Sequence, residues 1–493
     1  MNLRYAFALL LFFSLKPLMA DHLPGGSLTY KCNGGNMYEL KLSLLRACSG
    51  FQMVPQTLHL TNSCGVVFDV ANIPPVEVPI SDQICEADSA NSLCSGGAMI
   101  GFELYEFVTT QFLSPCDYWT VSWSICCRPP TVNVQSIPGI YIETTIYNVT
   151  DSCNNSPVFN HNGVPRVCVG QVVNFDASAT DPDGTRLEYQ FIDARYASPS
   201  PVSVNYVFPN YGGEPIAGMT LDQGTGQVTF TPPQEGYVVV AVQVNEYNSA
   251  NGLIGSVMRD FPFLVETCSN QAPTADSGSI NATSGGVTIS GPRALNLCSG
   301  NPGCATIEFT DPDAGGTLSI WTNVDAILPG STVEVSGTDP LNVNLCWDEV
   351  PASTGADFFV ITVMDDACSI RGARSYVYTL QISAAPYAGL DGSAISCELA
   401  QPINMLDSLQ GEPPAGGQWT DPLGAAHSEY FLGNLDQPGT YTYTITEGTC
   451  AGTAELLVDL LSVEDSLCIF LEVPEHALEM IDIYPNPTTG IIT

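Results

Sequence analysis

Apolar and polar residues alternate in short runs along most of the chain. Segments such as 227–231 and 441–445 alternate with a period of two, whereas the spacing typical of amphipathic helices is nearly absent. Gly, Pro, Asn and Asp interrupt these runs roughly every 8–12 residues, which is typical of β-sandwiches. The pattern therefore predicts an all-β chain of tandem sandwich domains.

Turn-rich stretches and changes in cysteine density divide the 493 residues into domains. After residues 1–20, we expect a Cys-rich β module, a first sandwich, a second and related sandwich, a smaller fourth unit and a C-terminal linker with a short tail. Their predicted ranges are 21–153, 154–268, 274–385, 386–461 and 462–493.

The second and third units are predicted to be repeats of each other. Each carries an Asp-Pro-Asp turn, at 181–183 and at 311–313, between a strand that contains Phe and a strand that begins with Leu. Two later strand pairs match in the same order, and both units end in a hydrophobic strand. Several matches in one order favour a shared fold.

The first twenty residues have the features of a secretory signal. Arg4 precedes an apolar run from Ala6 to Leu15, and Ala20 offers a small residue for cleavage. No later apolar stretch reaches the roughly 18 residues that a membrane-spanning helix needs. We therefore expect export and no integral membrane segment after cleavage.

Eighteen cysteines in an exported chain indicate disulfides. Zinc is disfavoured because no Cys-x-x-Cys occurs and the five His residues lack ligand spacing. Cys397 and Cys450 are predicted to pair because they are the only Cys of the fourth unit and flank its strands. Cys346–Cys368 is predicted because these residues close the strands on either side of a short hairpin, and Cys298–Cys304 because it would close a small loop. The pairing of the N-terminal cysteines stays open.

The charge balance limits the partners of this chain. It has 13 Lys and Arg against 51 Asp and Glu, a formal net charge of −38. Nucleic acids and anionic membranes are bound through clustered basic residues, so neither is expected as a partner. Cations would be attracted, although the acidity also keeps an extracellular protein soluble.

Acidic residues recur at equivalent places of the two repeats and suggest calcium. Alternate Asp residues in a turn offer oxygen ligands to one side, and further acids end a partner strand. The candidate ligands are Asp181, Asp183 and Glu246 in one unit and Asp311, Asp313, Asp365 and Asp366 in the other. The alternative is that Asp-Pro-Asp-Gly is only a turn in which Asp accepts backbone N–H groups.

Three segments of the chain resemble known families. Residues 21–32, 124–128 and 153–159 resemble the N-terminal module of large surface proteins of gliding, type IX-secreting bacteria. The two repeats resemble cadherin-like and PKD-type immunoglobulin-like domains, in which corresponding acids clamp the linker at a domain end. Residues 386–461, with Gly416-Gly417-Gln418-Trp419, are similar to immunoglobulin-like repeats of the same gliding-associated proteins.

The tail resembles the first motif of a type IX secretion (Por secretion system) C-terminal sorting domain. The residues that carry this likeness are Tyr484, Pro485, Asn486, Pro487 and Gly490. Such domains are several times longer than the tail of this chain. The resemblance implies contact with the type IX secretion machinery and a location outside the outer membrane, secreted or at the cell surface.

No common catalytic motif occurs in the sequence. Gly-x-Ser-x-Gly, His-Glu-x-x-His, a P-loop and Gly-x-Gly-x-x-Gly are absent, although paired carboxylates of a glycosidase stay open. The five Trp residues fit either core packing or stacking on sugars. We expect a non-catalytic adhesion or structural protein, not an enzyme, that binds surface polysaccharide or other surface proteins through its loops. The alternatives are a surface glycan-binding protein and, less favoured, a secreted hydrolase.

Overall fold

The computed structural model describes residues 23–465 and 468, apart from 81–82, 136–138, 150–152, 198–199, 208–213, 275, 314, 352–356 and 449. The expected signal peptide at residues 1–20 and the sorting-motif residues from Tyr484 to Gly490 lie outside the described residues. Within the described part, no helix is long and apolar enough to cross a membrane.

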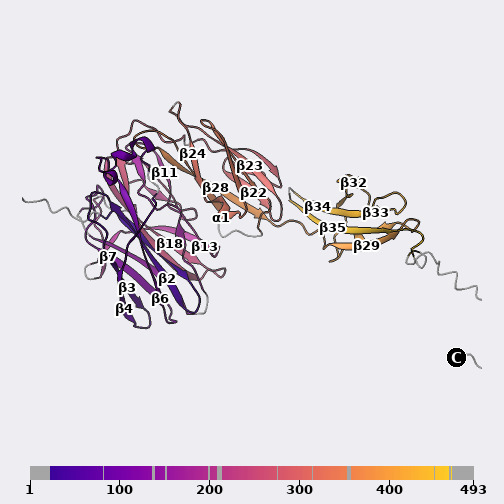
Figure 1. Cartoon of the computed structure of the whole chain (residues 1–493), viewed down its shortest axis with the longest axis horizontal. Helices are drawn as coiled ribbons and strands as arrows, with labels where there is room; N and C mark the ends of the chain where they lie inside the picture. Colours follow the sequence, from indigo (N-terminus) through magenta and orange to yellow (C-terminus); the bar gives the residue numbers. More distant parts are fainter. Residues whose placement is uncertain are drawn as a thin grey trace, which may run out of the picture.

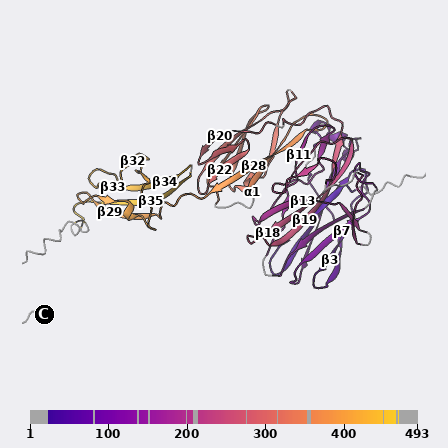
Figure 2. The ribbon, with the colours of Figure 1, turned by 180° about the vertical axis from the view of Figure 1, so that it is seen from behind.

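The regular structure is almost entirely β-structure, and the predicted all-β, disulfide-bonded, immunoglobulin-like fold class is confirmed. The one α-helix of the described residues is α1 (Val324–Ile327), a single turn. Figure 1 shows the first two units side by side in one body, followed along the long axis by the third unit and then the fourth. The view from behind in Figure 2 shows the same order.

The N-terminal unit folds two halves of a sheet over one core. One half has the order β4 (Val67–Ile73), β3 (Gln56–Asn62), β7 (Trp119–Ile125), β8 (Ile140–Ile146), and the other has β1 (Gly25–Cys32), β2 (Met37–Ala47), β6 (Phe102–Phe112), β5 (Val76–Val78). Alternate residues of β2 face inward, as a period of two requires, and Leu40, Leu42 and Leu44 lie buried with Trp119 and Trp123. Each buried leucine contributes roughly 1.5–3 kcal/mol.

The strand β19 (Leu253–Glu266) joins this unit to the next. It pairs with β8 through Gly255–Val257 and with β1 through Arg259 and Asp260, while its other edge pairs with β18 (Gly236–Tyr247). A strand of this length spans about 48 Å, enough to serve two sandwiches. The sheet therefore runs across the predicted boundary between 21–153 and 154–268, and these two ranges form one body rather than two separate modules.

The second unit has the strand order of an immunoglobulin-like sandwich. One sheet contains β11 (Val173–Asp176), β17 (Gln227–Phe230) and β16 (Thr220–Leu221), and the other contains β10 (Arg166–Cys168), β19, β18 and β13 (Arg186–Ile192). Strand β10 runs parallel to β19, as a first strand does when it crosses to the last strand of such a domain. Two short strands, β9 (Val158–Phe159) and β12 (Ala179–Thr180), pair beside the sandwich, and β14 (Arg195–Ala197) with β15 (Pro201–Ser203) extends the large sheet.

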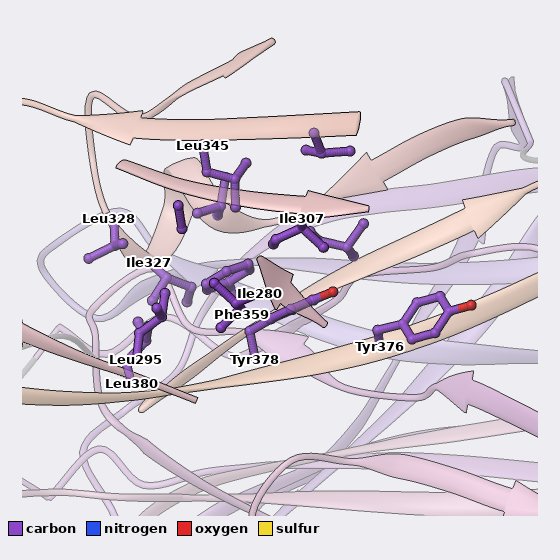
Figure 3. Close-up of a cluster of buried hydrophobic side chains, with 14 of the residues drawn as sticks. Ile280, Leu295, Ile307, Ile327, Leu328, Leu345, Phe359, Tyr376, Tyr378 and Leu380 are labelled. Atoms are coloured by element: carbon purple, nitrogen blue, oxygen red, sulfur yellow. The ribbon is translucent and has the colours of Figure 1, made fainter. Parts of the chain in front are cut away.

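The third unit repeats this strand order, and its two sheets contain only strands of the unit itself. The first sheet is β20 (Ile280–Gly285), β23 (Gly303–Phe309), β26 (Leu341–Trp347), β25 (Thr332–Gly337). The second is β21 (Thr288–Gly291), β22 (Ala294–Cys298), β28 (Ala373–Ser383), β27 (Phe358–Met364), β24 (Ser319–Thr322). The strands that the sequence alignment matches therefore pair in the same way in both units. Figure 3 shows its core, where Phe359 stacks on Tyr378 while the Tyr378 hydroxyl donates to the Gly278 carbonyl.

The fourth unit is a smaller sandwich of the same kind. One sheet is β29 (Gly392–Cys397), β35 (Cys450–Leu461), β34 (Gly439–Glu447), β31 (Gln418–Thr420), β32 (Ala426–His427), and the other is β30 (Ile403–Asn404) with β33 (Tyr430–Phe431). Trp419, Tyr441 and Tyr443 fill its core.

All eighteen cysteines lie in the described part of the chain and form nine disulfides, so the prediction of a disulfide-bonded chain is right. The three predicted pairings are wrong. Cys397 bonds to Cys468 and Cys450 to Cys298, Cys346 bonds to Cys304, and Cys368 bonds to Cys85. The error has a physical cause: Cys304 and Cys346 face each other on neighbouring strands β23 and β26, and most of the other pairs join loops that are far apart in the sequence.

Candidate functional site

Three predicted acidic residues meet at the junction of the first two units. Asp181 and Asp183 lie in the turn between β12 and β13, and Glu246 lies near the end of β18. One carboxylate oxygen from each residue lies within 4.8 Å of the others. The first predicted set of acids is therefore brought together.

Asp181 has two roles in this cluster. Its Oδ1 accepts hydrogen bonds from the backbone N–H groups of Asp183 at 2.8 Å and Thr185 at 3.1 Å, and Gly184 follows in the left-handed region at φ 69°. The Asp-Pro-Asp-Gly sequence is thus a genuine turn. Its Oδ2, however, is buried and has no hydrogen-bond partner.

The segment that enters the second unit contacts the cluster directly. The backbone N–H of Asn155 donates to Asp183 Oδ2 at 2.6 Å, and the Asn155 amide donates to Oδ1 at 2.8 Å. The Asn154 amide donates to Glu246 Oε2 at 2.7 Å. Because Cys153 is bonded to Cys32 at the end of β1, these contacts fix the acids to the N-terminal unit.

The electrostatics of the cluster disfavour negative charge. The Glu246 side chain is fully buried, and its burial together with the nearby Asp181 carboxylate raises its pKa to about 7, although hydrogen bonds from Asn154 and Thr185 oppose the shift. Burial also raises the pKa of Asp181. Within the described part of the chain, no Lys, Arg or His forms an ion pair with any of the three acids. The site therefore lacks a positive charge.

An equivalent cluster lies where the third unit begins. Asp311 Oδ1 accepts from the Asp313 N–H at 2.7 Å, while Asp311 Oδ2 is buried without a partner. The Gln271 N–H donates to Asp313 Oδ2 at 2.7 Å, and the Asn270 amide donates to Asp365 Oδ2 at 2.8 Å. Burial, together with neighbouring carboxylates, raises the pKa of Asp311 to about 6.

The second cluster departs from the prediction in three ways. Asp366 is exposed and its Oδ1 accepts from the Thr317 N–H, so it contributes to a loop and not to the cluster. Asp339, which the sequence did not indicate, accepts from the Asp311 N–H at 3.1 Å. Among the described residues, the acids of this unit also do not meet within the 4.8 Å that unites the first set.

The paired amides are the functional residues that sequence reasoning missed. Asn154-Asn155 and Asn270-Gln271 each follow a cysteine closely and precede a proline, Pro157 or Pro273. This shared order was a usable signal. In a linker motif made of acids the linker itself supplies the carboxylates, whereas here the linker supplies amides and the body of the domain supplies the acids.

A cavity of about 420 Å³ lies between the second and third units, beside Gln83 of the N-terminal unit. Its walls include Phe159, His161, Phe175 and Trp321, and the His161 and Trp321 ring centroids lie 4.5 Å apart. The other four tryptophans are buried in the cores, as core packing predicts. Trp321 is only partly buried.

The polar groups of this cavity do not form a Ser-His-Asp relay. His161 Nε2 faces both Asp176 Oδ2, at 3.5 Å, and Thr362 Oγ1, at 3.3 Å. In a catalytic triad the hydroxyl and the carboxylate contact opposite ring nitrogens. The arrangement therefore does not couple a base to a nucleophile.

Comparisons with known proteins add little to this description. No protein-family model and no curated protein matches the chain. Among solved structures, a three-immunoglobulin-domain fragment of titin, an E-to-A mutated variant, is 13% identical over 62% of this chain and 96% of that chain, with a TM-score of 0.18.

The N-terminal four immunoglobulin domains of Dscam1 isoform 6.44 are also similar. They are 11% identical over 88% of this chain and 99% of that chain, with a TM-score of 0.23. Scores this low carry no argument about function, and the immunoglobulin-like strand order rests on the chain's own sheets. Similarity to solved structures thus extends to tandem immunoglobulin-like domains and no further.

Proposed function

We propose that this protein is an extracellular, non-catalytic adhesion or structural protein that binds its partner through the loops of its sandwiches. The observation that carries this proposal is the series of immunoglobulin-like sandwiches whose junctions are closed by disulfides and by amide–carboxylate contacts. Such a frame holds loops at fixed positions, which is what recognition requires. Its partners are surface polysaccharide or other surface proteins, and the type IX secretion machinery delivers it to the cell surface.

Direct binding tests this function. The chain without residues 1–20 is applied to a glycan array and used for pull-down of surface proteins from intact cells. Saturable binding without chemical change of the bound molecule supports the proposal. Turnover of a glycan or peptide by the purified chain would contradict it and would favour the hydrolase alternative.

Calcium ions at the two junction clusters are part of this proposal. The buried Oδ2 atoms of Asp181 and Asp311 have no hydrogen-bond partner, and burial and mutual repulsion raise the pKa values of the acids. Calcium prefers six to eight oxygen ligands from carboxylates, amide carbonyls and water. Asp181, Asp183 and Glu246, and Asp311, Asp313 and Asp365, would supply the carboxylates, and the ion would stiffen each junction.

A melting experiment tests the calcium sites. The chain is unfolded by heat with 5 mM calcium or with chelator, conditions we choose so that calcium saturates a weak site. We expect calcium to raise Tm by mass action and the variant Asp181→Asn plus Asp183→Asn to lose that rise. A matched control is Asp421→Asn, because Asp421 Oδ1 accepts from Leu423 N–H and Ala425 N–H in the same turn geometry without a carboxylate cluster. An equal calcium response in all three proteins would contradict the proposal.

A glycan-binding role is the second candidate, and Trp321 favours it. This tryptophan is the one not sealed in a core, and it lines the cavity between the second and third units. Aromatic faces stack on the apolar faces of sugar rings. The variant Trp321→Ala is expected to abolish any glycan binding found on the array, whereas Trp419→Phe, in the fourth core, should leave it unchanged.

A further inference from the structure

Three disulfides form a short covalent route through the molecule. Cys48 bonds to Cys94, and only a short segment separates Cys94 from Cys85, which bonds to Cys368 in the third unit. From Cys368 the chain leads to Cys397, which bonds to Cys468 at the far end of the fourth unit. From Gly25 to Cys468, this route contains about 61 backbone residues instead of about 443.

Three other disulfides form a second route of similar length. Cys32 bonds to Cys153, Cys168 to Cys268 and Cys298 to Cys450. The backbone between these bonds, from Gly25 to Cys468, amounts to about 70 residues. The two routes use different disulfides and share only the backbone from Gly25 to Cys32.

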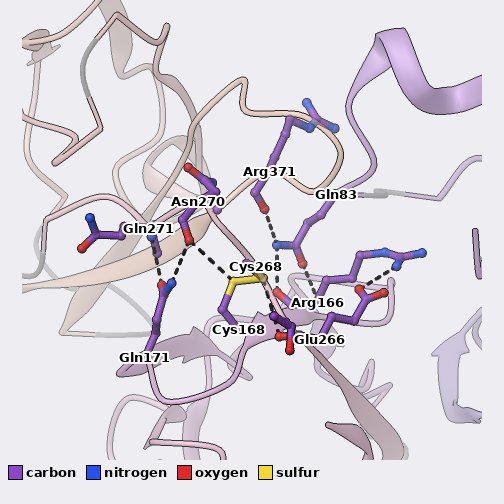
Figure 4. The surroundings of a disulfide bond; sticks show 12 residues. Gln83, Arg166, Cys168, Gln171, Glu266, Cys268, Asn270, Gln271 and Arg371 are labelled. Atoms are coloured by element: carbon purple, nitrogen blue, oxygen red, sulfur yellow. Dashed lines mark hydrogen bonds and ion pairs between the residues drawn. A yellow bond between two sulfur atoms is a disulfide. The ribbon is translucent and has the colours of Figure 1, made fainter.

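Local contacts hold the inter-unit bonds of both routes in place. Beside Cys85–Cys368, the Cys85 N–H donates to the Ser369 carbonyl at 3.1 Å. Figure 4 shows how Gln83 joins this loop of the third unit to the second unit, since its amide donates to the carbonyls of Arg371 and Arg166. Beside Cys298–Cys450, the Asn301 amide donates to the Ala451 carbonyl at 2.9 Å.

The same figure shows the second route at Cys168–Cys268. The Gln171 amide donates to the Asn270 carbonyl at 2.7 Å, and its Oε1 accepts from the Ala272 N–H at 3.2 Å. The linker to the third unit is therefore fixed where it leaves the disulfide. The three disulfides that lie at junctions of the third unit thus each stand beside backbone that is already hydrogen-bonded.

We propose that the protein is a tension-bearing connector with two covalent routes, of which the shorter carries the load at full extension and the longer carries it when the shorter is cut. When the two ends are pulled apart, backbone that lies inside a disulfide-closed loop carries no tension and cannot extend. Full extension is therefore limited to about 61 residues, or roughly 210 Å, against about 1,550 Å for the same chain without disulfides. Loss of Cys85–Cys368 transfers the load to the longer route, whereas loss of Cys298–Cys450 leaves it on the shorter one.

This inference rests on the proposed function in one respect, because tension arises only if the protein is attached at both ends. Its test needs no ligand, so that failure of the mechanical proposal and failure of the binding proposal are separate results. The experiment is single-molecule stretching of the full chain by handles at its two ends. The measured quantity is the greatest contour length released.

The routes predict a distinctive pattern among paired cysteine variants. Cys298→Ser plus Cys450→Ser should add nothing, because the shorter route is intact, and Cys85→Ser plus Cys368→Ser should add about 9 residues, or roughly 30 Å. All four substitutions together should add about 48 residues, or roughly 170 Å, because the next route must run through the third unit. The effect of the two pairs is therefore far from additive.

A control pair lies on neither route. Cys304→Ser plus Cys346→Ser removes a bond within the third unit and should leave the released length unchanged. The proposal would be overturned if the length released by the fourfold variant equalled the sum of the lengths released by the two pairs. A release of more than about 100 Å after loss of one inter-unit bond would also overturn it. Peptide mapping of the unreduced wild type gives an independent test that needs no variant to fold: pairings other than Cys85–Cys368 and Cys298–Cys450 would also overturn it.

Discussion

At the scale of single residues, one buried ion pair holds the first two units together. Arg128 and Asp260 are both buried, and the two guanidinium Nη atoms donate to the two carboxylate oxygens. Arg128 also donates to the carbonyls of Gly139 and Arg195, so that four of its five N–H groups have a partner. Burial raises the pKa of Asp260, and the Arg128 charge opposes that rise. The pair is tolerated in the interior because both partners are satisfied.

Removing one partner of this pair should be strongly destabilising. Arg128→Met leaves the Asp260 carboxylate buried without its countercharge, which costs about 3–5 kcal/mol. Arg128→Met plus Asp260→Leu should recover much of that loss. The measurement is urea unfolding of the three proteins. As a control, Arg186→Met breaks an exposed pair with Glu188 and should cost less than about 1 kcal/mol. A larger loss in the double variant than in Arg128→Met would contradict this account.

His161 should make the stability of the chain depend on pH. Burial lowers the pKa of His161, the Asp176 carboxylate opposes this, and the Arg259 charge lowers the pKa further. Because the folded-state pKa lies below the unfolded value of about 6.5, the unfolded chain binds more protons in acid. The contribution of His161 to stability is therefore present above pH 6.5 and is lost as the pH falls through the lowered value.

Comparing the pH dependence of stability between the wild type and a variant at residue 161 separates the titration of this histidine from that of the many carboxylates. Between pH 7.5 and pH 5, His161→Gln should lose less stability than the wild type in thermal melts. If Tm changes equally with pH in the wild type and in His161→Gln, this histidine does not titrate as its surroundings imply.

At the scale of elements, β19 is the strand that most changes the predicted division of the chain into domains. One edge of β19 pairs with β18 of the second unit, and the other pairs with β8 and β1 of the first unit and then with β10 of the second. The cores of the first and second units are therefore coupled through one strand. Most strands could be predicted from the sequence, because alternation is a local property that each strand carries by itself. The sharing of β19 could not, since the pairing of Gly26 with Asp260 depends on a contact across more than two hundred residues.

This coupling predicts a common unfolding transition for the first two units. Leu28→Ala, in the core of the N-terminal unit, and Val242→Ala, in the core of the second, should each lower the same calorimetric transition. Leu→Ala in a core costs about 2–5 kcal/mol, and the Val substitution removes less volume. Leu456→Ala, in the separate core of the fourth unit, should shift a different transition. Two independent transitions for residues 25–268 would contradict the shared sheet.

The candidate site was predictable only in part for a related reason. The acids of the first cluster could be found because Asp181 and Asp183 alternate in a turn and their equivalents recur in the next unit. The partner amides, Asn154 and Asn270, share a local order of cysteine, amide pair and proline, but their contacts with Glu246 and Asp365 depend on how the units meet at each junction. Asp366 was included because it adjoins Asp365, yet successive residues of an extended chain point in opposite directions.

At the scale of the whole molecule, a disulfide cross-links the fourth unit to the third. The fourth unit meets the third beside Cys298–Cys450, where Asn301 contacts Ala451, and the chain passes between them through Pro386 and Tyr387. Successive domains normally move relative to each other unless a large hydrophobic interface joins them. A net charge of −38 also makes the units repel one another. We therefore expect the disulfide to hold the arrangement of Figure 1 within a narrow range of orientations.

Removing that bond should broaden the overall shape without unfolding any unit. We expect Cys298→Ser plus Cys450→Ser to keep the melting profile of the separate cores but to widen the distribution of distances between a label in the third unit and one in the fourth. Double electron–electron resonance between labels at Glu334 and Glu455, both on exposed strand positions, would measure the distribution. Cys304→Ser plus Cys346→Ser is the matched control, because it removes a disulfide within the third unit and leaves the junction intact. Since calcium is proposed at other junctions, the broadening should be the same with calcium and with chelator. A distribution as narrow as that of the wild type would mean that the non-covalent contacts at Asn301 and Ala451 suffice to fix the fourth unit.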